Sequence, residues 1–370
     1  MPSQRECPPV SYDFAGNGAV GAATTVTYKK VSREADGERA KMNRIQGSKV
    51  LITGGAGFIG STIADQLFDH GAAEVRVLDN FIRGNRRNLE SAHSKGDLVI
   101  LDADVRDAEA VDAAVQGVDY VFHQAALRIT RCAEAPCEAI AVLINGTSNV
   151  LESCVRHNVK KLVAASSASV YGDPSYLPMD ESHPFNNRTL YGAGKVANEQ
   201  MYRSYTEMFQ LPYVAFRYFN VYGPRMDLDG VYTEVLVRWM DAIEAGQAPK
   251  IFGDGTQSMD FVFVEDVARA NIAGLVSDVS DEVFNVGTGI QTNLRELCDL
   301  LLKINNSSLQ PEYHEARKVN NVQTRRAAVA KAASMLNFTA KVDLETGLRA
   351  LTKWRTETRQ EMSLAAGGSQ

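Results

Sequence analysis

The feature that most constrains this chain is a glycine-rich turn that joins a predicted strand to a predicted helix. A short aliphatic run, Lys49-Val-Leu-Ile-Thr53, is followed by Gly54, Gly57 and Gly60. The first glycine permits a tight turn, the second lets a phosphate approach the backbone, and the third lets the helix pack closely on the strand. Unpaired N–H groups and the helix dipole favour an anion at the start of such a helix. The turn therefore predicts the beginning of a dinucleotide-binding βαβ unit.

Strand-like and helix-like segments alternate along the chain as far as Tyr218. Strands are expected at 49–53, 74–79, 98–101, 120–123, 161–165 and 212–217, and helices at 58–70, 108–115, 140–157 and 191–209. Such alternation is typical of parallel sheets, whose right-handed crossovers place helices on both faces. The predicted fold class is therefore α/β, a doubly wound parallel Rossmann sheet.

The alternation weakens after Tyr218. Later helices are expected at 234–245, 294–304 and 344–354, and strands at 260–264 and 282–285 are expected to return to the first sheet. Because open α/β sheets bind ligands at the carboxyl ends of their strands, we expect a smaller, partly discontinuous C-terminal substrate-binding lobe there. The predicted organisation is a disordered N-terminal extension (1–44), a dinucleotide-binding Rossmann domain (45–218), the substrate-binding lobe (219–357) and a flexible tail (358–370).

Charge and cysteine content exclude several classes of protein. Lys and Arg together number 39 against 45 Asp and Glu, a net charge of −6, whereas binding to nucleic acid or a membrane surface needs a basic face. No apolar run approaches the roughly 18–20 residues of a membrane span, and the N-terminus lacks a secretory pattern. The 5 cysteines show no zinc-site spacing, which favours reduced thiols and no metal site. We therefore expect a soluble, cytoplasmic protein.

The predicted dinucleotide is NAD. Asp79 ends the second predicted strand, 19 residues after Gly60, where a carboxylate accepts hydrogen bonds from both ribose hydroxyls of NAD and repels a 2′-phosphate. Nearby arginines at 83, 86 and 87 favour the alternative, NADP. Further candidate cofactor contacts lie at the helix start and at other strand ends, where an ordinary loop is the alternative interpretation: Phe58, Ile59, Asn80, Asp104, Val105, Ala125, Ala126 and Tyr218. Of these, Asp104 and Val105 are expected to meet the adenine, and the small Ala125 and Ala126 leave space for a ribose.

A phenol and an ammonium group share one face of a predicted helix. Tyr191 and Lys195 are four residues apart. A free tyrosine has a pKa near 10, but a cation within about 4–6 Å favours its phenolate, so the pair can act as a general base. The run Ser166-Ser-Ala-Ser169 ends the fifth strand, where a hydroxyl can hold a substrate hydroxyl or simply mark a turn.

Five motifs in order identify a family resemblance. They are the glycine turn, Asp79, Ser166-Ser-Ala-Ser-Val-Tyr-Gly172, the Tyr191/Lys195 pair and Arg217-Tyr-Phe-Asn-Val-Tyr-Gly-Pro224. Together they resemble the extended short-chain dehydrogenase/reductase family, of the nucleotide-sugar epimerase/dehydratase type. The pattern is most similar to that of the UDP-glucose (UDP-galactose) 4-epimerases, and it covers about Lys49 to Trp354.

The resemblance implies a role for each matching residue. Tyr191 would take the proton of the 4-hydroxyl group, Lys195 would be its electrostatic partner and a ligand of the NAD ribose, and Ser167 would be the catalytic hydroxyl. Asn220 would contact the diphosphate of the sugar nucleotide. Arg128 stands where the epimerases have a basic residue, and Arg317 resembles a distal phosphate-binding arginine. Ser169 completes the expected substrate contacts.

The implied reaction is inversion at C4 of a nucleotide-diphosphate sugar that is UDP-linked. Hydride passes from C4 to NAD⁺, and the transient 4-keto sugar then rotates in the site while the nucleotide stays fixed. Hydride returns to the opposite face of the sugar. NAD is recycled and is expected to stay bound. The relatives associate through the helices that correspond to 140–157 and 191–209, so we expect a homodimer.

Three departures from the family pattern leave the sugar open. Met259 stands where relatives usually have an arginine on the diphosphate, 317–322 lacks a Gly-Asp pair, and Ala328 replaces an aspartate. The missing arginine removes a bidentate contact, for which Lys318, Arg325 or Arg326 are candidate substitutes. Arg325 also falls near the position that gates sugar size. Subfamily drift with a repacked lobe is the alternative explanation.

Other reactions on the same scaffold are rival interpretations. A 4,6-dehydratase needs a carboxylate pair directly after the catalytic hydroxyl, where this chain has Ala168 and Ser169. A 4-reductase or a uronic-acid decarboxylase stays open, with Arg128 and Arg325 as candidate contacts for a carboxylated sugar. A non-enzymatic NAD-sensing protein can lose the Tyr/Lys pair, whereas this chain retains both residues.

Overall fold

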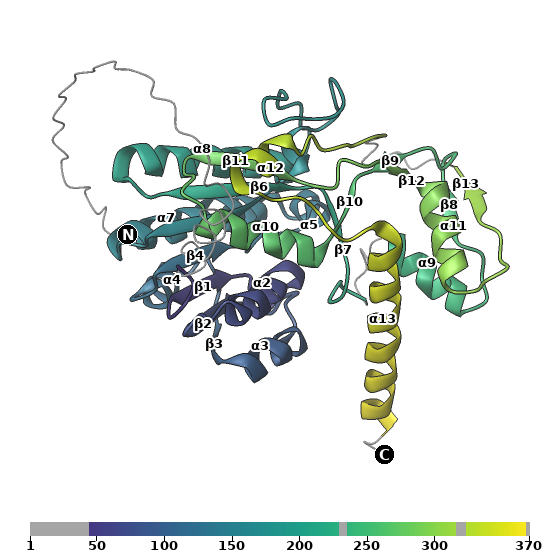
Figure 1. Cartoon of the computed structure of the whole chain (residues 1–370), viewed down its shortest axis with the longest axis horizontal. Coiled ribbons are helices and arrows are strands. Elements are labelled where there is room, and N and C mark those ends of the chain that lie inside the picture. The colour runs from purple at the N-terminus through teal and green to yellow at the C-terminus, as the bar shows by residue number, and fades with distance from the viewer. Residues whose placement is uncertain (1–43, 229–234, 316–322, 368–370) are drawn as a thin grey trace, which may run out of the picture. The chain divides into compact units, whose positions relative to one another are not determined.

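The computed structural model describes residues 44–228, 235–315 and 323–367 (Figure 1). Its central sheet has seven strands in the order β11-β6-β5-β4-β1-β2-β3, and every neighbouring pair is parallel. The strands are β1 (Lys49–Thr53), β2 (Glu74–Asp79), β3 (Asp97–Asp102), β4 (Tyr120–His123), β5 (Lys161–Ser167), β6 (Tyr213–Tyr218) and β11 (Glu282–Val286). The predicted doubly wound Rossmann sheet is confirmed. Its strand order reverses between β1 and β4, and such a reversal opens a ligand-binding crevice.

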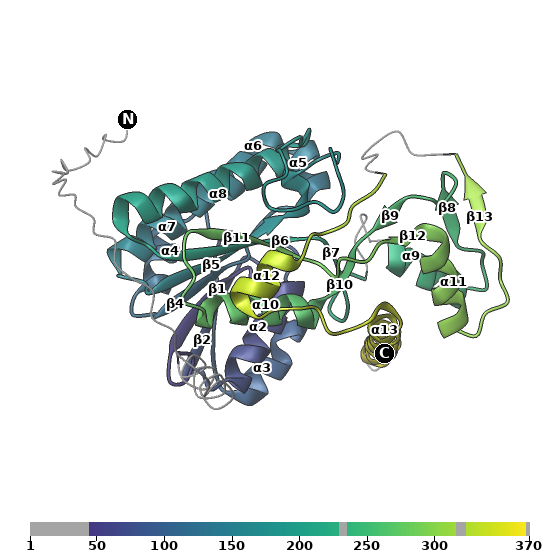
Figure 2. The same ribbon diagram turned by 45° about the horizontal axis from the view of Figure 1, so that its top comes forward.

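Helices cover both faces of the sheet (Figure 2). One face carries α2 (Phe58–Asp69), α3 (Glu90–Lys95), α10 (Val264–Val276) and α12 (Ala330–Leu336), and the other carries α4 (Ala108–Val115), α5 (Ile129–Glu134), α6 (Pro136–Ile140), α7 (Thr147–Arg156) and α8 (Leu190–Phe209). Successive strand residues serve the two layers: Val50 and Ile52 pack with α2, whereas Leu51 packs with α4 and α7. This arrangement explains why the strands are continuous apolar runs rather than alternating ones.

A lobe beside the main sheet, in the region where substrate binding is expected, contains short strands and three helices among its described residues, seen to the right in Figure 1. Its helices are α9 (Val235–Glu244), α11 (Leu294–Ile304) and α13 (Leu344–Gly367), and its strands are β7 (Asn220–Tyr222), β8 (Lys250–Phe252), β9 (Ser258–Met259), β10 (Phe261–Phe263), β12 (Thr292–Asn293) and β13 (Glu312–His314). Trp239, Leu297 and Leu348 are buried in its separate apolar core. A reciprocal capping box between Asn293 and Glu296 starts α11.

Several predicted features of this later part need correction. β11 does return to the main sheet beside β6, but β10 pairs with β7 in a separate two-stranded sheet. The residues after β10 form α10, which packs against α2 and which the sequence pattern did not reveal. The expected flexible tail from 358 is also wrong, because α13 continues to Gly367. The expected N-terminal extension lies almost entirely outside the described residues. Within the described ranges, no helix combines the length and the apolar character that crossing a bilayer requires.

Candidate active site

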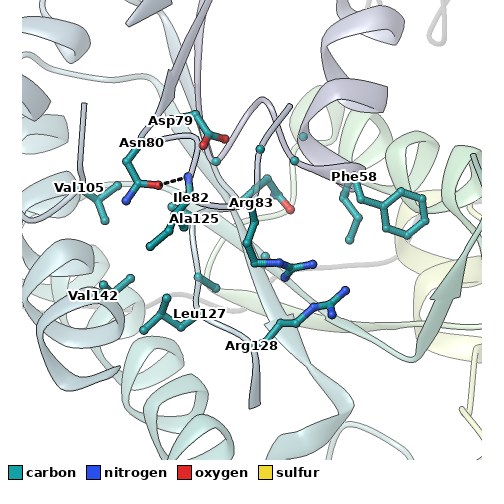
Figure 3. A pocket seen from close by; sticks show the side chains of 18 of the residues that line it. Phe58, Asp79, Asn80, Ile82, Arg83, Val105, Ala125, Leu127, Arg128 and Val142 are labelled. Atoms are coloured by element: carbon teal, nitrogen blue, oxygen red, sulfur yellow. Dashed lines mark hydrogen bonds between the residues drawn. The ribbon is translucent and has the colours of Figure 1, made fainter. Parts of the chain in front are cut away.

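A cavity of about 390 Å³ opens at the carboxyl ends of the strands, at the reversal between β1 and β4. Its walls come from the glycine turn, the ends of β2, β3, β4 and β5, the start of α8 and the end of β6. All the predicted cofactor contacts line it: Gly54, Gly57, Phe58, Ile59, Gly60, Asp79, Asn80, Asp104, Val105, Ala125, Ala126, Lys195 and Tyr218. Figure 3 shows this cavity with Asp79 and Asn80 at one end and Arg83 and Arg128 at the other.

The glycine turn is packed so tightly that larger residues would not fit. Gly54 has φ of +68°, and a Cβ there would lie 2.8 Å from the Cα of Ala125. A Cβ on Gly60 would lie 2.5 Å from the carbonyl oxygen of Gly54. Gly57, the N-cap of α2, provides no side-chain cap for the first-turn N–H groups. Phe58, Ile59 and Gly60 of this first turn line the cavity, so the turn fits the pyrophosphate of a dinucleotide.

Asp79 provides a carboxylate at the end of β2. It is 8% exposed, and its two oxygens accept hydrogen bonds from the backbone N–H groups of Ala56 (2.9 Å) and Phe81 (2.9 Å). Burial raises the pKa of Asp79, although both N–H donors oppose that shift. A carboxylate has about four acceptor positions, so Asp79 retains capacity for ribose hydroxyls.

Neighbouring strand ends hold a second carboxylate. Asp104 accepts hydrogen bonds from the Arg106 guanidinium (2.8 Å) and from Asn80 Nδ2 (2.7 Å). Hydrogen bonding to Arg106 is the main reason why the pKa of Asp104 falls to about 2. The Asn80 side chain in turn accepts from the Ile82 N–H (Figure 3). Asp104 is therefore a fixed anion at the cavity wall, on the side expected to meet adenine.

Tyr191 and Lys195 lie together at the inner end of the cavity. Lys195 is 2% exposed, its Nζ lies 5.9 Å from the Tyr191 ring centroid, and Nζ donates to the Ala165 carbonyl oxygen at 2.7 Å. Burial lowers the pKa of Lys195 to about 8, against the opposing effect of Glu199. Burial also raises the pKa of Tyr191, while hydrogen bonding to Ser167 and the charge of Arg325 lower it. The phenol on its own therefore keeps its proton at neutral pH.

A buried polar cluster supports this pair from behind. Ser166 Oγ donates to Glu199 Oε1, and Arg217 binds both oxygens of Glu199 through Nε (2.9 Å) and Nη2 (2.7 Å). Tyr191, Lys195 and Glu199 occupy positions i, i+4 and i+8 of α8, so they share one face of the helix. Glu199 thus balances the buried charge of Arg217 and fixes α8 against the end of β5.

A buried histidine lies on the other side of Lys195. His123 ends β4, and its ring nitrogens bond to Thr53 Oγ1 (2.7 Å) and Thr147 Oγ1 (3.0 Å). The Thr147 hydroxyl donates to the Leu143 carbonyl oxygen, so it accepts from Nε2–H. Burial, followed by the charge of Lys195, lowers the pKa of His123 to about 3. His123 is therefore a neutral packing residue.

The predicted substrate contacts are only partly brought together. Three of them, Arg128, Ser169 and Tyr191, line a second cavity of about 280 Å³ at the mouth of the first one. Ser167 lies behind it, accepts from the Ser169 N–H at 3.1 Å and hydrogen bonds to Tyr191. Asn220, in β7, is not among the residues that line either cavity. Arg317 lies outside the described residues.

Sequence reasoning missed several cavity residues. The Tyr218 hydroxyl oxygen lies within hydrogen-bond distance of Gln124 Oε1 (3.1 Å) and Asn271 Oδ1 (2.9 Å), and these contacts hold Gln124 directly after β4. Asp227 contacts Arg83 and Arg128, at 3.5 and 3.9 Å, where the lobe meets the mouth. The helical spacing from Tyr191 gave a signal for Glu199, whereas nothing local to Asp227 indicated its position.

Comparisons with known proteins agree with this geometry. The NAD dependent epimerase/dehydratase family matches residues 50–287. A putative UDP-glucose 4-epimerase of Methanocaldococcus jannaschii is 36% identical over 82% of this chain and 97% of its own length. A UDP-N-acetyl-alpha-D-glucosaminuronate decarboxylase of Bacillus cytotoxicus is 31% identical over 85% and 99%. A solved UDP-N-acetylglucosamine 4-epimerase of Methanobrevibacter ruminantium M1, in complex with UDP-N-acetylmuramic acid, has a TM-score of 0.80 and 33% identity, covering 85% of this chain and 99% of that one.

Proposed function

The chain belongs to the NAD dependent epimerase/dehydratase family, whose cofactor is NAD, and from that premise we propose that it is a 4-epimerase of a UDP-linked sugar. One observation carries the proposal. Tyr191, with Ser167 and Lys195 beside it, lines both the cavity that fits NAD and the adjoining cavity that holds Arg128 and Ser169. A base at that junction can reach a hydroxyl of a ligand placed next to the cofactor.

The residues divide the work as follows. The glycine turn, Asp79 and Lys195 hold the dinucleotide. When bound, oxidised NAD supplies the hydride acceptor for C4 of the sugar and a positive charge near the phenol. Tyr191 then takes the proton of the 4-hydroxyl group, because nearby positive charge favours the phenolate. Ser167 donates to the phenolate oxygen and orients it, and Lys195 keeps its position through the Ala165 carbonyl oxygen.

Relatives with other activities define the alternatives. Ala168 and Ser169 follow Ser167 in the turn η3 (Ala168–Val170), so the carboxylate pair of a 4,6-dehydratase is missing from that place. A decarboxylase would use the same oxidation at C4 but would release carbon dioxide from a carboxylated sugar. The retained Tyr191 and Lys195 support both reactions, and the identity of the released product separates them.

The test uses purified full-length chain with UDP-glucose, UDP-N-acetylglucosamine and UDP-glucuronic acid, each without added NADH. We expect conversion of at least one of them to its 4-epimer, followed by proton NMR, and loss of that conversion in Tyr191→Phe. Net consumption of added NADH would instead identify a reductase, and release of carbon dioxide a decarboxylase. Conversion by Tyr191→Phe at the wild-type rate would contradict the assigned base.

We also propose that the enzyme is a cytoplasmic homodimer that pairs through the helical residues 140–157 and 191–209. Large apolar side chains are exposed on these helices, with Ile140 at 49%, Met208 at 56% and Phe209 at 42%. These three exposed side chains belong to helices that correspond to the associating helices of the relatives, so they are candidates for the association surface. Light scattering coupled to size-exclusion chromatography is expected to give twice the mass of 40.4 kDa, and the monomer mass would contradict this part of the proposal.

A further inference from the structure

An extended segment, residues 323–329, is fixed beside the proposed sugar site. The Arg325 N–H donates to the Ser258 carbonyl oxygen at 2.9 Å, and Met179 bonds to Arg326 and Ala328 at 2.8 Å each. The Ala327 N–H donates to the buried carboxylate of Asp260 at 3.1 Å. Backbone bonds on both sides of Arg325 therefore set where its side chain begins.

The segment packs on the turn that follows the catalytic strand. Ala327 and Val329 belong to the same apolar cluster as Ala168 and Val170 of η3. This turn also carries Ser169, which lines the second cavity together with Tyr191. The segment thus lies at the reacting end of the site and not at the adenine end, which is bounded by Asp79 and Asp104.

The Arg325 side chain has a buried hydrogen-bond donor without an acceptor. Its Nε is buried and has no hydrogen-bond partner among the described residues. Neighbouring polar groups of the segment are satisfied, since Thr324 Oγ1 bonds to Ser258 Oγ (3.1 Å) and to Gln291. Burying a donor of a charged group without a partner is costly, so such a group is usually completed by something that binds.

Two residues interact with the guanidinium group of Arg325. It interacts with Tyr191, whose pKa it lowers, and with Asp173. Burial lowers the pKa of Arg325 more than the charges of Asp173 and Tyr191 raise it, so the surrounding protein compensates the buried charge only in part. Arg325 does not itself line either cavity, but its segment packs on the turn that carries Ser169, which places its guanidinium group nearer the sugar end of the site than the adenine end.

Resting on the proposed function, we propose that Arg325 recognises a carboxylate carried by the sugar, so that the substrate class is a carboxylated nucleotide sugar. A planar guanidinium binds a carboxylate through two parallel hydrogen bonds. A carboxylate would complete the buried Nε and neutralise the charge together. A neutral hexose offers only hydroxyl groups and would leave the cation with the partial compensation that Asp173 gives.

The test measures binding to NAD-loaded Tyr191→Phe protein by calorimetry, so that turnover does not enter. Two matched pairs of probes differ in a carboxylate: UDP-glucuronic acid against UDP-glucose, and UDP-N-acetylmuramic acid against UDP-N-acetylglucosamine. We expect the acidic member of at least one pair to bind about 10- to 100-fold more tightly, as for hydrogen bonds to a charged group. Adding Arg325→Met removes that preference and leaves the affinity for UDP and for the neutral sugars within about 3-fold.

Two further variants keep the result decisive. Arg325→Lys retains the positive charge but cannot form a bidentate pair with a carboxylate, so it is expected to keep part of the preference for the acidic sugars. Arg326→Met, its neighbour in the same segment, serves as the matched control and is expected to keep all of it. Thermal unfolding of each variant checks that the segment still folds.

Three outcomes would overturn the inference. One is the absence of any preference in both pairs, another is a preference unchanged by Arg325→Met, and the third is an equal loss for UDP and all four sugars, which would place Arg325 on the diphosphate. Failure of the proposed function is a different observation, namely no binding of UDP to NAD-loaded protein. The two failures are therefore distinguishable.

Discussion

The cofactor side of the site and the substrate lobe are built in different ways. On the cofactor side, contacts lie at the ends of parallel strands, and the sheet itself sets their spacing: Asp79 ends a strand, and Gly54 and Ala125 follow strands. The loops of the lobe have no such regular strand spacing, and buried carboxylates hold them in place instead. Asp260 is 0% exposed and accepts from Thr288, Gly289 and Ala327. The carboxyl ends of parallel strands fix a site through the regular spacing of the backbone, whereas a site built on loops depends on single side chains.

The two regions are joined through one buried polar network. Arg217 donates to the Tyr171 hydroxyl (2.9 Å), which donates to Asn285 Oδ1 (2.6 Å). Asn285 Nδ2 then donates to the Met179 and Ala328 carbonyl oxygens (2.9 and 3.2 Å). The cluster behind Lys195 is therefore continuous with the segment that carries Arg325. The comparison predicts that changes on the cofactor side alter chemistry or NAD affinity, while changes in the lobe alter stability and substrate binding.

The largest expected effect is at Tyr191. Tyr191→Phe removes the base but not the ring, so we expect a loss of about 10²- to 10⁴-fold in kcat with NAD content and thermal stability unchanged. Tyr205→Phe, on the same helix α8, is the matched control and is expected to stay within about 2-fold of wild type. Steady-state rates with the best sugar substrate check this. A loss of NAD together with activity would show that Tyr191 holds the cofactor rather than the proton.

Asp260→Ala is expected to affect the lobe most. It removes an acceptor of four hydrogen bonds at 2.7, 2.7, 2.8 and 3.1 Å and leaves buried N–H groups unpaired. We expect the free energy of unfolding to fall by about 3–5 kcal/mol and UDP affinity to fall more than NAD affinity. Asp254→Ala, an exposed carboxylate of the same lobe, is the control. Denaturant unfolding measures the first effect, and an equal loss of NAD affinity would contradict the comparison.

Acid is expected to weaken the cofactor side through His123. The folded state holds this imidazole neutral with a pKa of about 3, whereas the unfolded chain takes up a proton near 6.5. Stability from this residue is therefore present above pH 6.5 and is lost as the pH falls toward 3, by about 2 kcal/mol between pH 6.5 and 5. Urea unfolding at both pH values measures it. The same slope in His123→Gln would show that other groups are responsible.

The smallest expected effect is on cofactor choice. Asp79→Asn keeps the acceptor oxygen for one backbone N–H but loses the charge, so we expect NAD affinity to fall about 10-fold and NADP affinity to fall less. Asp102 is its register partner on β3 and ends that strand in the same way. Asp102→Asn is therefore the matched control and is expected to leave both affinities unchanged. Fluorescence titration with each dinucleotide decides the result.

Much of the cofactor side could be predicted because its signals are local. Each of these signals lies within one short stretch of contiguous chain: the glycine spacing, the strand that ends at Asp79 and the Tyr191/Lys195 pair. The lobe was predicted less well. β10 was expected in the main sheet and α13 was expected to end early, because short strands and a long polar helix carry weak periodic signals.

The sequence by itself determined the doubly wound sheet, the glycine turn after β1 and the shared helix face of Tyr191 and Lys195, since these follow from the repeat lengths of strands and helices. Only the tertiary structure decided which distant side chains meet. It brought Glu199 to Ser166 and Arg217, and it brought the segment that carries Arg325 against η3, more than a hundred residues away. Such contacts depend on how the layers pack and on which buried charges need partners. The spacing of residues along a chain does not encode these pairings.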